Sequence, residues 1–159
     1  MNWKLSHRAA PTAVRIADRH YNRQKPGTPQ FVPPGKCIVL LTLDNSALWV
    51  TSHQKYQLHK WKGAWVNSLF RNEGNLLSSQ LILQAIAVTK FYWPKVPQLG
   101  IITFINASKI KSTHPGYCYL KAGFKKIGFT KKDNLIVLQL LPKQMPSPES
   151  PFSNQLKLF

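Results

Sequence analysis

A glycine-containing turn between an expected strand and an expected helix is the first place where residue types and spacing could do chemistry. The strand 64–70 runs into Arg71-Asn72-Glu73-Gly74-Asn75-Leu76, and an apolar helical pattern follows. Such a turn aims several backbone amides at one point, and the helix dipole adds positive potential there. The pattern predicts an anion site, although a plain strand-to-helix turn is the alternative. The residues assigned to this site are Leu69, Phe70, Arg71, Asn72, Glu73, Gly74, Asn75, Leu76, Ser78 and Ser79.

A second informative stretch is Tyr119-Leu120-Lys121-Ala122-Gly123-Phe124, in which Gly123 is placed to end a short helix. The Arg-x-x-Gly turn resembles the pyrophosphate-binding motif of the GNAT superfamily of acyl-CoA N-acyltransferases. The second stretch resembles the Tyr-x-x-x-Gly-Phe segment found late in GNAT domains. The alternative for Tyr119 is a purely structural place in the core.

The resemblance extends over residues 2–141 and implies a mixed α/β fold, with a mostly antiparallel sheet of six to seven strands flanked by helices. It also implies acetyl-CoA or another acyl-CoA as the acyl donor. In the family pattern, Tyr119 lies near the coenzyme A sulfur and protonates the departing thiolate, and Asn106 touches the cofactor or the tyrosine. Leu76 departs from the motif, which has Gly or Ala there, so its side chain is expected to crowd the pyrophosphate.

A general base for this chemistry must come from a short list, because the chain has only five acidic residues. Asp18 and His20 are the best-placed candidates, and a water ordered by the backbone is a further one. Glu73 suits the role poorly because it lies within the anion turn. The scarcity of acids argues against paired-carboxylate glycosidases and carboxylate-rich metal nucleases. The five scattered histidines form no metal-binding pair, so no metal is expected.

The charge balance points to a polyanionic partner, since 22 Lys and Arg face 5 Asp and Glu, for a formal net charge of +17. Two segments mix cations with aromatic and amide side chains, which suits phosphates and unstacked bases together. The alternative is a solvated basic face with Trp61 packed on the core. The residues assigned to nucleic acid are Arg15, Arg19, Tyr21, Asn22, Arg23, Gln24, Lys25, Lys60 and Trp61.

Size, basicity and expected fold together resemble the phage Mom-type proteins, GNAT-like enzymes that modify adenine amino groups in DNA. The expected function is therefore acyl transfer to an amino group of nucleic acid, most simply an adenine-type base in DNA. A base inside a duplex has to be flipped out to be reached. Two alternatives stay open: an N-acetyltransferase acting on a protein or a small amine, and a non-catalytic basic nucleic-acid-binding protein.

The elements expected to position these residues form one domain over 1–141, followed by a proline-rich extension over 142–159 that we expect to be an extended arm. Apolar runs are too short to span a bilayer, no signal peptide is evident, and two cysteines suggest a reducing cytoplasmic setting. The proline-rich segment 22–36 is expected to be an irregular loop. Periodicity predicts strands at 3–6, 37–43, 47–52, 64–70, 99–105, 124–130 and 135–141, and helices at 11–21, 77–92 and 117–122.

Overall fold

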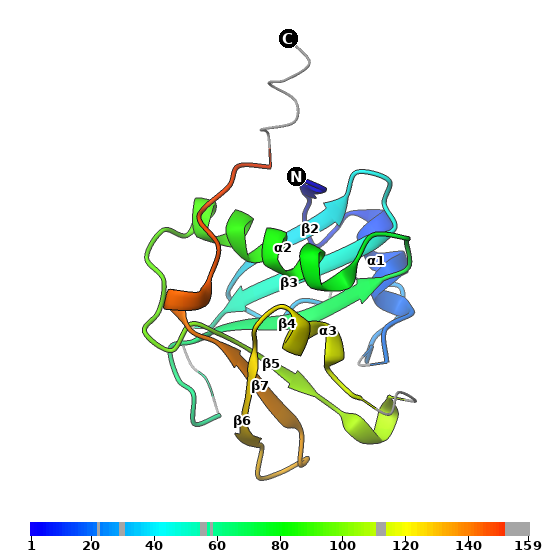
Figure 1. The fold of residues 1–159 in the computed structure, drawn as a ribbon. Helices are drawn as coiled ribbons and strands as arrows, with labels where there is room; N and C mark the ends of the chain where they lie inside the picture. Colours follow the sequence, from blue (N-terminus) through cyan, green and yellow to red (C-terminus); the bar gives the residue numbers. More distant parts are fainter. Residues whose placement is uncertain (22, 29–30, 55–56, 58, 111–113, 152–159) are drawn as a thin grey trace.

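A seven-stranded sheet forms the centre of the molecule in the computed structural model, which describes residues 1–21, 23–28, 31–54, 57, 59–110 and 114–151. The strands are β1 (Trp3–Leu5), β2 (Lys36–Thr42), β3 (Ala47–His53), β4 (Trp65–Asn72), β5 (Ile101–Ile105), β6 (Lys125–Phe129) and β7 (Ile136–Leu140). Their order across the sheet is β1-β2-β3-β4-β5-β7-β6 (Figure 1). Neighbouring strands are antiparallel except β4 and β5, which are parallel. The expected mixed, mostly antiparallel α/β class is confirmed.

Three helices cover the two faces of this sheet. The helices α2 (Ser78–Tyr92) and α3 (Tyr117–Lys121) lie on one face, whereas α1 (Pro11–Asp18) lies on the other (Figure 1). Consecutive residues of β3 show the division, because Trp49 packs in the cluster beneath α2 while Leu48 and Val50 pack against α1. Burial on both faces explains why β2 and β3 are almost continuous apolar runs rather than alternating ones.

The first helix ends earlier than its apolar spacing predicts. We expected a helix over 11–21, but α1 stops at Asp18. The amides of Arg19 and His20 bond to carbonyls three residues back rather than four, at 3.1 and 3.0 Å, which tightens and ends the last turn. As a result, His20 and Tyr21 leave the helix axis and follow a separate turn.

The fourth strand continues beyond its expected end at Phe70. Pairing with β3 persists as far as the Ala47–Asn72 pair, so Arg71 and Asn72 belong to β4 and not to the turn. The helix α2 then begins after Leu77, whose side chain makes no capping hydrogen bond. Its buried face includes Leu81, Ile82, Ala85, Ile86 and Val88, in agreement with the broad apolar face expected from the sequence.

Residues 142–151 are the described part of the extension that we expected to be an extended arm, and they contact the domain. A short 3₁₀ turn, η2 (Pro142–Gln144), is followed by Met145, which is buried in the core beneath α2. The backbone amide of Glu149 donates to the carbonyl of Ala87, and the Lys90 ammonium donates to the carbonyl of Pro146. Residues 142–151 thus pack along α2. In the described residues, no helix combines the length and apolar character needed to cross a membrane.

Candidate active site

A cavity lies where the two parallel strands of the sheet separate. The strands β4 and β5 pair only over Trp65–Ile101, Val66–Ile102 and Asn67–Thr103. On the other side of β4, Val50 pairs with Leu69 and Thr51 with Asn67, so Ser68 is an extra residue in a β-bulge. A bulge bends its strand and increases the local twist. From Ser68 onward the strands diverge, and a cavity of about 380 Å³ lies at this point.

This cavity reaches from one face of the sheet to the other. Its lining includes Phe70 and Tyr119, which belong to the side covered by α2 and α3. It also includes Leu69, from the side covered by α1, and His20 and Tyr21, which follow that helix. Two ligands could therefore meet within it from opposite faces. The structure brings these five predicted residues to one place, although they are separated by as many as 99 positions in the chain.

The hydroxyl of Tyr119 is held at the centre of a buried polar network. It donates a hydrogen bond to Asn67 Oδ1, and Asn67 Nδ2 donates to the carbonyls of Val50 and Leu69, both at 2.9 Å. Thr103 Oγ1 adds a bond to the Asn67 carbonyl at 3.1 Å. Burial, with a smaller contribution from Cys118, raises the pKa of Tyr119 well above its ordinary value, so the phenol keeps its proton at neutral pH.

Asn67 is a central polar residue of the cavity that the sequence analysis did not single out. Its side chain bridges the two carbonyls flanking the bulge and fixes Tyr119 at the same time. The available signal was an amide side chain in the middle of the mainly apolar strand expected over 64–70, where a buried polar group requires partners. Ser68, the bulged residue, lines the cavity beside it, and its buried Oγ has no hydrogen-bond partner in the described structure.

His20 is an uncharged imidazole at the cavity wall. Burial, followed by the nearby positive charge of Arg71, lowers its pKa to about 4, while a hydrogen bond to the backbone of Phe70 opposes that shift. The ring stacks on that of Tyr21, with centroids 4.5 Å apart. Of the candidate general bases, His20 is the one that the structure brings to the cavity.

The turn before α2 is held together by side chains as well as by backbone. Asn72 Oδ1 accepts from the amide of Gly74, and Asn72 Nδ2 donates to the Leu76 carbonyl and to Ser78 Oγ. A Cβ at Gly74 would lie 2.2 Å from Ser46 Oγ, so a side chain there would force Ser46 to move. The amides of residues 75–80 meet no acceptor within the described part of the chain. Leu76 is exposed.

Glu73 forms ion pairs with two arginines at this turn. Its carboxylate accepts from Arg19 Nε and Nη2, both at 2.6 Å, and from Arg71 Nε at 2.7 Å. These bonds, led by the one from Arg19, lower the pKa of Glu73 to about 2. Glu73 is therefore an ionised ion-pair partner and not a proton acceptor. The three side chains leave one net positive charge beside the unbonded amides.

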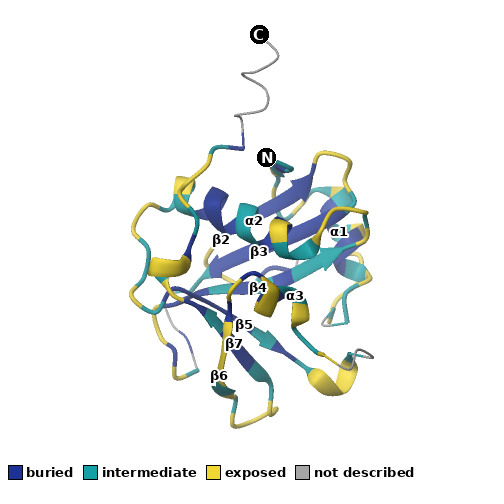
Figure 2. Cartoon of the chain, viewed as in Figure 1, coloured by how far each residue is buried: buried dark blue, intermediate teal, exposed yellow. Residues whose placement is uncertain are grey.

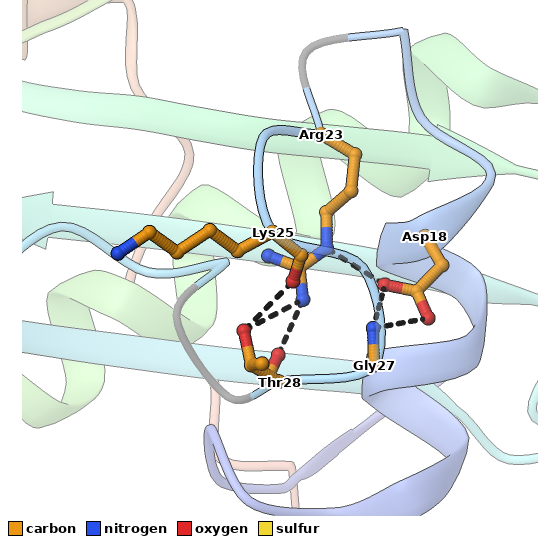
Figure 3. Close-up of polar contacts among 5 residues, drawn as sticks. All are labelled: Asp18, Arg23, Lys25, Gly27 and Thr28. Atoms are coloured by element: carbon orange, nitrogen blue, oxygen red, sulfur yellow. Dashed lines mark hydrogen bonds and ion pairs between the residues drawn. The ribbon is translucent and has the colours of Figure 1, made fainter.

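Asp18, expected as a candidate general base, is not among the residues that line the cavity. Its carboxylate accepts from Arg23 Nε at 2.7 Å and from the amide of Gly27 at 3.0–3.1 Å, and Arg23 also donates to the Thr28 carbonyl (Figure 3). The hydrogen bond from Arg23 is the largest of the effects that lower the pKa of Asp18. These contacts tie the segment after α1 into a closed turn, which is a structural role.

Asn106 is also engaged elsewhere. Its Oδ1 accepts from the amide and the hydroxyl of Ser108, capping the short turn η1 (Ala107–Lys109), and it is not part of the cavity lining. The contact with the tyrosine that the resemblance implied for Asn106 is made by Asn67 instead. The difference arises because β5 ends at Ile105, beyond the point where the strands part.

The residues assigned to nucleic acid differ widely in their availability. Arg23 has only 4% of its side chain exposed, and Trp61 packs against Ile102, Val137 and Phe104. Trp61 thus takes the core position named above as the alternative, with the Lys60 ammonium 5.1 Å from its ring centre. Arg15, Gln24 and Lys25 are exposed, Arg19 is bound to Glu73, and Asn22 lies outside the described residues.

No group of three or more His, Cys, Asp or Glu side chains within the described residues could hold a metal ion. The sequence matches no protein-family model, and neither curated proteins nor solved structures yield a significant match. The geometry of the cavity is therefore the basis for any statement about function.

Proposed function

We propose that this protein is an N-acyltransferase of the GNAT type that moves an acyl group from an acyl-CoA to an amino group of nucleic acid, most simply an adenine-type base in DNA. The observation that carries the proposal is the cavity at the separation of β4 and β5, with the Tyr119 phenol and the uncharged His20 in its lining. The strand order, with its single parallel pair beside a bulge, also supports the resemblance to that family.

The donor side fits the turn before α2. A diphosphate needs hydrogen-bond donors and positive potential, and the amides of residues 75–80 supply the donors at the start of a 15-residue helix. The net positive charge of the Arg19, Arg71 and Glu73 cluster adds to that potential. The turn leads back along β4 through Phe70, which contacts Tyr119 with ring centroids 6.2 Å apart. A ligand anchored at the turn can thus extend toward the phenol.

The chemistry asks for positioning more than for strong acids and bases. An acyl-CoA supplies an activated acyl group as a thioester. The acceptor nitrogen forms a bond to the acyl carbon, the carbon–sulfur bond breaks, the nitrogen loses a proton, and the sulfur gains one. His20 is placed to take the proton from the nitrogen. Because the pKa of Tyr119 is raised, the phenol acts as a hydrogen-bond donor to the developing thiolate, exchanging its bond to Asn67.

The acceptor side is the face on which α1 lies. His20 and Tyr21 stack there, and across the cavity Phe104 lies 5.4 Å from the ring of His59. Aromatic walls suit a planar acceptor because a flipped base gains stacking with them. The formal charge of +17 supplies the attraction to a polyanion that a small-amine or protein substrate does not explain.

The test is mass spectrometry of nucleosides from DNA of cells that express the protein, where a new mass reports acceptor and acyl group together. Tyr119→Phe should reduce the modified fraction about 10–100-fold, because a hydrogen bond realised during the reaction is lost. Tyr92→Phe is the matched control, since the Tyr92 hydroxyl is buried and has no partner in the described structure. Equal activity of the two variants would refute the role of Tyr119, and a new mass on protein alone would refute the acceptor.

One observation favours a second candidate, a non-catalytic nucleic-acid-binding protein. Glu73 places a carboxylate beside the anion turn and already occupies both nearby arginines. Isothermal titration calorimetry with acetyl-CoA separates the two candidates. The transferase should bind at micromolar to millimolar concentrations, and no heat at millimolar ligand would favour the binding protein.

A further inference from the structure

A surface rich in lysine lies on the opposite side of the cavity from α1. Between residues 109 and 143 the sequence has eight lysines and a single acid, Asp133. Five of these lysines are exposed on α3, on the edge strand β6 and on the turn that follows it (Figures 1 and 2). We define this lysine face as Lys121, Lys125, Lys126, Lys131 and Lys132.

The charges of the lysine face are not neutralised by the protein. Every ion pair found in the described residues involves Arg19, Arg23 or Arg71, so none of the five lysines has a carboxylate within 4 Å there. Five ammonium groups on consecutive elements of the chain repel one another, and this repulsion raises the free energy of the folded state unless an anion binds. Lys121 precedes β6, Lys125 and Lys126 begin it, and Lys131 and Lys132 follow its end. The five lysines therefore bracket a five-residue strand that is roughly 17 Å long, which favours an extended polyanion over a single phosphate ion.

Aromatic side chains organise this face and connect it to the cavity. The Lys126 ammonium lies 4.3 Å from the centre of the Phe129 ring, and the Lys121 ammonium lies 5.6 Å from that of Tyr117. Tyr117 is 55% exposed and also lines the cavity. The lysine face therefore begins at the rim of the cavity and extends from it along β6.

From this geometry we infer that the lysine face binds the phosphate backbone of the DNA duplex that flanks the base held in the cavity. Its length matches about five base-pair steps, since successive phosphates of one strand are roughly 3.4 Å apart along the helix axis. The inference rests on the proposed acceptor class, nucleic acid, and not on the acyl-transfer chemistry. It assigns duplex contacts to a surface that the sequence analysis did not select.

Edge protection and self-association are two alternative roles for the same lysines. In the first alternative, lysines on an edge strand bind no ligand and only prevent the strand from pairing with another chain. The exposed Ile127 and Phe129 could instead belong to an interface with a second copy of the protein. Two like-charged faces would repel each other across such an interface, so charge complementarity favours the duplex.

The experiment measures binding of a 24-base-pair duplex by fluorescence anisotropy at several salt concentrations, without any acyl donor. The test variant is Lys125→Gln, Lys126→Gln and Lys131→Gln. The matched control, Lys4→Gln, Lys95→Gln and Lys143→Gln, removes the same charge from other parts of the fold. Each lost phosphate contact reduces the slope of log affinity against log salt by about one, so the test variant should lose about three and the control less than one.

A second variant keeps the proposal testable if the triple variant does not fold. Lys131→Gln with Lys132→Gln changes only exposed residues of the turn after β6 and should lower the slope by about two. Equal slopes for test and control variants would overturn the inference, because binding would then follow net charge alone. Slopes that stay unchanged in both variants would overturn it as well. So would light scattering that shows a dimer whose association is stronger in the test variant than in the unmodified protein.

Failure of the transferase proposal gives a different result. If the protein binds the duplex as described but no modified nucleoside is found, the lysine face stands and the acyl-transfer chemistry fails. If nucleosides are modified while the test variant binds the duplex as tightly as the control variant does, the chemistry stands and the lysine face fails.

Discussion

The two cationic regions of this molecule are built from different residues and do different physical work. After α1, Arg19 and Arg23 are each paired with a carboxylate, and Lys25 is exposed. On the lysine face the positive charges are ammonium groups with no carboxylate partner in the described structure. One region uses its charge to hold the fold together, and the other leaves it available at the surface.

The difference follows from the chemistry of the two side chains. A guanidinium is planar, weakly hydrated and able to make several directed bonds, so it can be buried and can hold a turn in place. Arg23 does this with Asp18 and the Thr28 carbonyl while exposing only 4% of its side chain (Figure 3). An ammonium is strongly hydrated and remains at the surface. The lesson is that a high count of arginines near a candidate site does not by itself identify a surface that binds nucleic acid.

The largest expected effect comes from removing the carboxylate of one of the ion pairs that follow α1. Asp18→Asn leaves the buried Arg23 without a carboxylate and weakens its bond to the Gly27 amide. We expect the free energy of unfolding to fall by about 2 kcal/mol, the range for hydrogen bonds to charged groups. Urea unfolding measures it. Asp133→Asn, on the turn beside the lysine face, is the control and should change stability by less than about 0.5 kcal/mol. Similar losses in both variants would contradict the contrast.

Some of these features could be predicted from the sequence, whereas the burial of particular side chains could not. Element order followed from apolar periodicity, and the fold class followed from the resemblance to the GNAT superfamily. Of the cavity residues, Tyr119 was identified from its motif position and His20 from the short list of possible general bases. The burial of Trp61 was one of two alternatives, and that of Arg23 was not predicted, because both depend on which loops fold back onto the sheet.

The missed residues have a common physical cause. Asn67 matters because of a bulge whose existence depends on the register of β4 against β3, and register is a property of two strands. The lysine face depends on which strand is at the edge of the sheet and on where the five acids end up. The packing of Met145 beneath α2 likewise depends on a distant element. A single sequence does not show which strands pair, in what register they pair, or which distant segments pack together.

A second prediction uses pH to test His20, whose burial, with a smaller contribution from the charge of Arg71, lowers its pKa and keeps it uncharged. The folded-state pKa of His20 is about 4, below its ordinary value of 6.5. As the pH falls from 6.5 toward 4, the unfolded chain binds a proton there that the folded protein does not, so stability decreases. With a discount for partial exposure, the loss is about 1 kcal/mol by pH 4.5. His20→Gln should flatten this part of the curve, and curves that stay parallel would contradict the pKa.

A third prediction converts paired arginines into unpaired ones. Glu73→Gln removes the carboxylate that holds Arg19 and Arg71, so the region after α1 should acquire the electrostatic character of the lysine face. Duplex binding should strengthen a few-fold and its salt slope should steepen by about one, since Arg19 is half exposed. Anisotropy titrations at two or more salt concentrations measure both quantities. Weaker binding would mean that Glu73 positions the arginines for the ligand instead of competing with it.

The smallest expected effect is also the most direct comparison of the regions, one cation from each. Lys132→Gln should lower the salt slope of duplex binding by about one while leaving the urea midpoint almost unchanged, because Lys132 is exposed and unpaired in the described structure. Arg19→Gln should leave the slope nearly constant, because the Arg19 guanidinium is held by Glu73 and makes no phosphate contact that could be lost. Arg19 is 51% exposed and its pair is at the surface, so the stability change should also stay small. If Arg19→Gln lowers the slope as much as Lys132→Gln does, ion pairing within the fold does not decide which cations meet the duplex.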